Sequence, residues 1–132
     1  MSALAAAWPQ ALCVMAGAAL GGLLRWLVAL WLNPLWNGLA LGTLMVNAVG
    51  GLAIGMAAAW FSQRPNELLH LLLVTGVLGG FTTFSAFSVE SLLLLQRGAL
   101  WLAAAHTLVH VLGALAAAAL GWAIGQAAVA AR

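Results

Sequence analysis

The residues from Gly76 to Glu90, GVLGGFTTFSAFSVE, place glycines, hydroxyls and phenylalanines in a stretch that is otherwise apolar enough for a membrane helix. Adjacent glycines weaken a helix by roughly 1 kcal/mol each relative to alanine, so Gly79 and Gly80 predict a break near the middle of this stretch. Backbone carbonyls freed at such a break are suitable ligands for a small hard cation. The alternative is that both glycines only allow close helix packing.

The residues after the glycine pair form a mixed aromatic and polar face. At about 100° per residue, one sector of a helix holds Thr83, Phe84, Phe87, Glu90 and Ser91. The positive edge of a phenyl ring and the proton of a hydroxyl can each replace part of the hydration of an anion. The same pattern fits phenylalanines in a core and hydroxyls that bond back to the preceding turn. The hydroxyls outside this sector belong to Thr82, Ser85 and Ser88.

Further polar side chains in the apolar stretches are candidates for an ion pathway. Asn47 must face protein or water, either as a hydrogen-bonding link between helices or as part of a pathway wall. Arg25 lies roughly 10 Å before the end of its apolar stretch, so it either reaches the membrane surface or lines a water-filled vestibule. Glu90 lies roughly 15 Å beyond Gly80, and is either solvated near the membrane surface or part of the pathway.

His106 and His110 are four residues apart in the last apolar stretch and therefore share a helix face. Two imidazoles at this spacing can bind a metal ion or haem, or each can hydrogen-bond to a neighbouring helix. Spacing places no third protein ligand beside them. The single cysteine, Cys13, excludes an intrachain disulfide and fits a small buried apolar residue.

The composition predicts a membrane protein. Of 132 residues, 66% are hydrophobic and 5% are charged, whereas roughly a quarter of a soluble domain is charged. The four cationic residues are all arginines and are scattered, so no basic patch indicates nucleic-acid binding. No nucleophile is paired with a base, so catalysis is not indicated. No basic residue precedes the first apolar stretch, which we therefore expect to be retained rather than cleaved.

Four stretches are long enough to span a bilayer, so we expect an all-α, multi-pass protein with a single membrane domain over residues 1–132. An even number of spans puts both termini on one side, with Arg64 and Arg132 there and Arg97 and Arg25 on the other. This near balance fits either a weakly determined orientation or insertion both ways and antiparallel pairing. The spans lie near residues 10–32, 40–61, 67–95 and 100–127, with Trp31, Trp36, Trp60 and Trp101 near their ends.

Glycines spaced by four occur in every span and predict close helix contacts and an oligomer. The pairs are Gly17 and Gly21, Gly51 and Gly55, Gly76 and Gly80, and Gly121 and Gly125.

Three motifs, one in each of the first three spans, give the chain a family resemblance. They are GGLLRW at residues 21–26, GTLMVNAVGG at 42–51 and GGFTTFSAFSVE at 79–90. In this order they resemble the Fluc/CrcB family of small bacterial fluoride channels, also described as fluoride exporters. The third motif is the most specific, and the resemblance covers nearly the whole chain.

The resemblance implies an antiparallel, dual-topology dimer in the bacterial inner membrane, with two pores that carry fluoride passively out of the cytoplasm. It implies a structural sodium ion at the dimer centre, held by backbone carbonyls of Gly79 and Thr82 from both subunits. It also implies Arg25 near a vestibule. The implied anion pathway contains Asn47, Phe84, Phe87, Thr83, Ser85, Ser88 and Glu90.

One departure concerns the last span, where family members commonly carry a pore-facing serine or threonine. Here Ala114 and Ala118 occupy the expected positions. This leaves open whether the pore is slower and whether the dimer is a homodimer or contains a paired homologous subunit. It also leaves open replacement of the hydroxyl by Thr107 or the histidines. The alternative functions are a small proton-coupled multidrug exporter and a non-transporting membrane scaffold or haem subunit. The exporter lacks support, because the first span carries Arg25 and no acidic residue.

Overall fold

The computed structural model describes residues 7–36 and 38–131, and all regular structure in these residues is helical. Four helical stretches are long and apolar enough to cross a membrane, as the sequence predicts. The first is α2 (Trp8–Leu32), which continues into the 3-10 turn η1 (Asn33–Leu35). The second is α3 (Leu41–Gln63), the third runs over residues 67–96, and the fourth is α7 (Leu100–Ala130).

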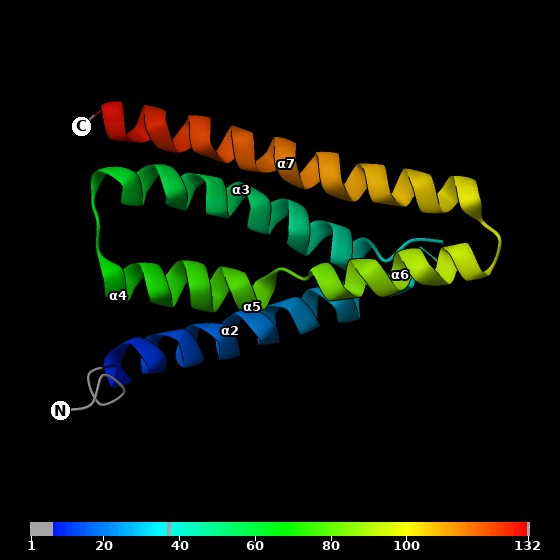
Figure 1. Cartoon of the computed structure of the whole chain (residues 1–132), viewed down its shortest axis with the longest axis horizontal. Coiled ribbons are helices and arrows are strands. Elements are labelled where there is room, and N and C mark those ends of the chain that lie inside the picture. Colours follow the sequence, from blue (N-terminus) through cyan, green and yellow to red (C-terminus); the bar gives the residue numbers. More distant parts are fainter. Residues whose placement is uncertain (1–6, 37, 132) are drawn as a thin grey trace.

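The four spans lie side by side, with the start of α2 and the end of α7 at the same end of the molecule (Figure 1). α2 packs on the third span, and α3 packs on α7. Leucines and tryptophans are exposed along all four spans, so lipid or a second chain must cover this apolar surface. The position of Arg132, used above to weigh orientation, lies outside the described residues.

Glycines bring the helices into close contact, as the sequence predicts. A methyl group added at Gly17 would lie 2.8 Å from the Cα of Gly76, so α2 and the third span meet backbone to backbone. A methyl group at Gly125 would lie 3.0 Å from the carbonyl oxygen of Met56, so α3 and α7 meet in the same way. Small residues at such crossings are typical of helix packing in membranes.

The third span changes its backbone conformation along its length. It begins as α4 (Glu67–His70), widens into the π-helical segment η2 (Leu71–Leu78) and returns to α-helix in α5 (Gly79–Phe81). After two extended residues it continues as α6 (Phe84–Gln96). Wide helical turns of this kind are frequent near functional sites.

The two extended residues are Thr82 and Thr83, with ψ angles of 157° and 116°. The sequence predicts the helix break at Gly79 and Gly80. This position was wrong, because both glycines are helical. Gly80 serves packing instead: a methyl group there would lie 2.6 Å from the carbonyl oxygen of Ala18 on α2. The position of the extended residues therefore depends on tertiary hydrogen bonds rather than on glycine propensity alone.

A tight turn joins α6 to α7 and makes them antiparallel neighbours. Gly98 in this turn has φ = 72°, a left-handed conformation that glycine adopts without a Cβ clash. Side chains of α6 and α7 that are distant in sequence thereby come into contact. Glu90 on α6 contacts His106 on α7.

Candidate ion pathway

Asn47 on α3 holds the extended residues of the third span. Its Nδ2 donates to the carbonyl oxygen of Thr83 at 2.9 Å, and its Oδ1 accepts from the Thr83 N–H at 2.8 Å. Thr83 is buried, so its backbone groups would be costly to leave unpaired. Asn47 therefore links α3 to the third span, which is one of the two roles that the sequence left open for it. Its other Nδ2 hydrogen is not needed for this pairing and can serve another acceptor.

The start of α6 is fixed by its own hydroxyls. Thr83 Oγ1 accepts from the N–H of Ala86 at 3.2 Å, which is the role of a helix N-cap. The same oxygen lies 3.2 Å from Ser85 Oγ. Thr82 Oγ1 donates to the Leu78 carbonyl at 2.9 Å, and Ser88 Oγ donates to the Phe84 carbonyl at 2.9 Å. Thr82 and Ser88 therefore bond back to the preceding turn, one of the two readings left open above.

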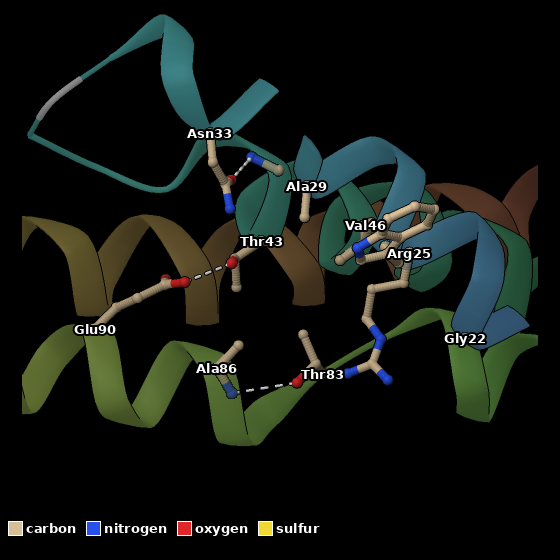
Figure 2. Close-up of a pocket in the computed structure, with 11 residues that line it drawn as sticks. Gly22, Arg25, Ala29, Asn33, Thr43, Val46, Thr83, Ala86 and Glu90 are labelled. Atoms are coloured by element: carbon tan, nitrogen blue, oxygen red, sulfur yellow. Dashed lines mark hydrogen bonds between the residues drawn. The ribbon is translucent and has the colours of Figure 1, made fainter. Parts of the chain in front are cut away.

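A cavity of about 320 Å³ lies on one side of Thr83, between α2, α3 and α6. Arg25 extends from α2 into this cavity, and Glu90 on α6 points toward Thr43 on α3 (Figure 2). Thr43 Oγ1 donates to Glu90 Oε1 at 2.5 Å. Arg25 thus lines this cavity. Thr43 was not predicted as a site residue, although it lies one helical turn before Asn47 on α3.

A second cavity of about 410 Å³ also reaches Thr83 and is mostly apolar. Asn47 lines it beside Phe84 and Phe87, whose ring centroids are 5.2 Å apart. Phe87 is buried, at 8% exposed, whereas Phe84 is 75% exposed. Phe87 is therefore a core residue of the single chain, whereas Phe84 is not. The two cavities share Thr83, which therefore lies between a cavity lined by Arg25 and Glu90 and a cavity lined by Phe84 and Phe87.

Comparison with known proteins identifies the family. The family model described as CrcB-like protein, Camphor Resistance (CrcB), matches residues 12–122. The chain belongs to the CrcB family.

Curated relatives within the CrcB family carry a more specific name. A protein of Aromatoleum aromaticum named Fluoride-specific ion channel FluC is 50% identical over 123 residues, covering 92% of this chain and 94% of the relative. Proteins of the same name from Pseudomonas paraeruginosa and Escherichia coli are 46% and 42% identical. They cover 90% and 84% of this chain, and 99% and 89% of the relatives. The names describe an ion channel, not an enzyme, and with the four apolar spans they indicate a multi-pass membrane protein.

On the last span of this CrcB-family chain, histidines rather than hydroxyls contact Phe87. Phe87 stacks on His106 at 5.3 Å and on His110 at 5.0 Å between ring centroids. Ala114 lines the aromatic cavity, but its carbonyl oxygen would lie 2.8 Å from a methyl group at Gly51, so it also packs against α3. Thr107, the hydroxyl considered as a substitute, is on the exposed face of α7.

Ala118 likewise belongs to the contact between α3 and α7. Its carbonyl oxygen is the nearest atom to a methyl group built at Gly55. A small residue at Ala118 therefore lies where the two backbones approach closely, which gives it a packing role.

Proposed function

We propose that this chain forms a fluoride-selective channel that lets fluoride leave the cytoplasm passively across the bacterial inner membrane. The names of its relatives support this function. The observation that carries the proposal is the meeting of two cavities at Thr83, with Asn47 and two phenylalanines beside it. An anion needs donors in place of its lost water, and this site supplies an amide N–H, hydroxyls and phenyl edges.

The two sides of the proposed pathway do different work. Arg25 supplies a positive charge to the vestibule, which Glu90 also lines, and attracts anions to its own side of the cavity. On the other side of Thr83 is an apolar cavity lined by Phe84 and Phe87. It offers few polar groups that could form hydrogen bonds to an anion larger than fluoride. The free hydrogen of Asn47 Nδ2 faces neither backbone atom of Thr83 and is the donor available at the junction. Glu90 lies further along α6 and lines the vestibule, whereas Ser85 contacts Thr83 Oγ1 and lines neither cavity.

A second copy is part of the proposed channel. Phe84 is 75% exposed and the outer surface is strongly apolar, so a partner subunit that covers this face would complete the wall of the aromatic cavity. We propose an antiparallel homodimer in which each subunit supplies phenylalanines to two pores. The near balance of arginines supports insertion in both orientations.

A sodium ion at the dimer centre is also proposed, and the carbonyls of Gly79 and Thr82 fit it. In a continuous helix the N–H of Thr83 would bond to Gly79, but it donates to Asn47. The N–H of Ala86 would bond to Thr82, but it donates to Thr83 Oγ1. Both carbonyls therefore lose their usual helical donors, and Gly79 is exposed. Hard carbonyl oxygens suit a small cation, which would hold the two subunits together.

The test of function is fluoride release from liposomes that contain the purified protein, measured with a fluoride-selective electrode. We expect fluoride to leave down its gradient after a potassium ionophore removes the charge build-up, and chloride to stay inside. Equal release of both anions, or no release from protein that remains folded, would contradict a fluoride-selective channel. Preparation in a sodium-free buffer should weaken the dimer if the ion is structural, and an unchanged dimer would exclude that role.

A further inference from the structure

Three ionisable side chains meet at one point between α6 and α7. Glu90 lies beside His106 and His110, and one potential ligand atom from each residue lies within 4.8 Å of the others. His106 is 1% exposed and His110 is 5% exposed, so both imidazoles are held inside the protein. The histidine pair thus has the third ligand that sequence spacing could not place.

The partners around this cluster leave two ligand atoms directed at each other. Ser91 Oγ lies 3.0 Å from His106 Nδ1, and Thr43 donates to Glu90 Oε1. The remaining atoms, His106 Nε2 and Glu90 Oε2, are 3.3 Å apart. Histidines and carboxylates that bind metals are commonly oriented by hydrogen bonds of this kind on their other polar atom. A serine hydroxyl can accept from Nδ1–H as well as donate to Nδ1, so it supports the tautomer whose Nε2 binds a metal.

His110 has a buried ring nitrogen, Nδ1, with no hydrogen-bond partner in the described part of the chain. A buried polar atom without a partner costs roughly 1–3 kcal/mol, and such atoms in native structures often mark the site of an absent ion or water. Its ring is packed against Phe87 and His106 rather than fixed by a hydrogen bond. It can therefore turn about its side-chain bonds without breaking a polar contact.

We propose that Glu90, His106 and His110 form a binding site for a divalent transition-metal ion such as Zn²⁺. Two imidazoles and one carboxylate suit zinc or cobalt, whereas calcium and magnesium prefer oxygen ligands. Around a tetrahedral ion with bonds of about 2.1 Å, ligand atoms are roughly 3.4 Å apart, so small rotamer changes bring the three atoms into place. The chain supplies three ligands, which leaves a fourth position for water or an anion.

The site would also affect conduction, a consequence that rests on the proposed fluoride channel. The ion with one carboxylate and two neutral imidazoles carries a net positive charge beside Phe87 in the proposed pathway. Such a charge would hold an anion at the fourth position and fix the aromatic ring. Bound metal should therefore slow fluoride flux.

Binding can be tested by titrating the purified full-length protein in detergent with Co²⁺ and following the visible absorption of four-coordinate cobalt. We expect one ion per chain, displaced by Zn²⁺. His110→Gln is the decisive variant because His110 Nδ1 has no bond to lose, and its affinity should fall roughly tenfold or more. Glu90→Gln should weaken binding in the same way. His70→Gln, which changes an exposed histidine outside the cluster, should bind as the wild type does.

The proposal is overturned if the wild type binds no cobalt at a defined ratio, or if His110→Gln and Glu90→Gln bind it unchanged while circular dichroism shows an intact fold. A separate flux measurement compares each protein with and without Zn²⁺. Wild type and His70→Gln should slow and recover with a chelator, whereas His110→Gln should show no zinc effect on its own rate. Binding without an effect on flux would refute only the control of conduction. Absence of fluoride flux from every protein would refute the proposed function and leave the binding result standing.

Discussion

The side-chain amide of Asn47 on α3 makes two hydrogen bonds to the backbone of a single residue, Thr83, in the third span. The amide oxygen replaces the helical acceptor that the Thr83 N–H would have in a continuous helix, and the amide N–H adds a bond to the Thr83 carbonyl, which as the N-cap of α6 also accepts the first bond of that helix. Membrane interiors tolerate irregular backbone only where such partners are present. This pairing explains how the third span can open where the two cavities meet.

Replacement of Asn47 should destabilise the protein and the pathway together. Asn47→Leu leaves the buried N–H of Thr83 unpaired and removes one of the donors to its carbonyl, so we expect a loss of about 1–3 kcal/mol in the free energy of unfolding. Asn47→Asp keeps the acceptor, removes the donor and adds a negative charge, so it should reduce fluoride flux more than stability. Denaturant titration and liposome flux measure the two effects. Wild-type stability in Asn47→Leu would mean that another group pairs with Thr83.

The two phenylalanines should respond differently to the same substitution. Phe84 is 75% exposed, so Phe84→Ile should change stability by less than about 0.5 kcal/mol. Phe87→Ile removes a buried ring that stacks on two histidines and should cost about 1–3 kcal/mol. Each should lower fluoride flux roughly two- to tenfold if a ring edge stabilises the ion by about 0.5–1.5 kcal/mol.

Phe61→Ile is the matched control for this pair, because Phe61 contacts His70 at the far end of α3 and lines neither cavity. Its fluoride flux should equal that of the wild type. Unchanged flux in both Phe84→Ile and Phe87→Ile would remove the aromatic rings from the mechanism.

The sequence predicted the spans well because their signal is local: about 20 apolar residues with tryptophans near the ends. It predicted the glycine contacts because small residues recur every four positions. It misplaced the extended residues, since glycine propensity favours Gly79 and Gly80 while Asn47 and the Thr83 hydroxyl hold the chain open further on. The position of the extended residues thus depends on a contact between two spans, and no local sequence pattern contains that contact.

The cluster of Glu90 with the histidines could not be predicted for the same reason. His106 and His110 share a face by simple helical spacing, but their distance from Glu90 depends on the turn at Gly98 and on the register between α6 and α7. The signal available in the sequence was the separation of Glu90 and His106 by a short turn, which favours antiparallel contact without fixing which residues meet.

Thr43 orients Glu90 and should matter to both stability and flux. Thr43→Val keeps the shape of the side chain and removes the donor to Glu90, so we expect a cost of about 1.5–3 kcal/mol, typical of a bond to a charged group. Fluoride flux should fall, because the Glu90 carboxylate lines the vestibule and loses the donor that fixes its position there. Thr75→Val, at an exposed position of η2, is the matched control and should leave both unchanged. If Thr43→Val and Thr75→Val lower stability and flux equally, the loss comes from the change of threonine to valine and not from the lost bond to Glu90.

Adjacent glycines of α2 offer a test of helix packing. A methyl group at Gly21 would meet the carbonyl oxygen of Val77 and would lie 2.8 Å from the amide nitrogen of Phe81, and backbone atoms cannot move aside easily. Gly21→Ala should therefore cost about 1–3 kcal/mol. A methyl group at Gly22 meets nothing within 4 Å, so Gly22→Ala should be neutral or gain up to about 1 kcal/mol of helix propensity. Thermal unfolding in detergent distinguishes them, and similar melting temperatures would argue against tight packing at Gly21.

The positive charge of Arg25 should affect how fluoride flux depends on the salt concentration. Arg25 lines the cavity that leads to Thr83, so Arg25→Gln should lower fluoride flux roughly two- to tenfold at low ionic strength. The difference should shrink as the salt concentration rises, because the screening length falls to about 3 Å at 1 M. Arg64→Gln removes a charge that lies over Trp60 and outside both cavities, and it should conduct normally. A defect in Arg25→Gln that persists at high salt would mean that Arg25 acts by direct contact with the ion or by packing rather than by its long-range field.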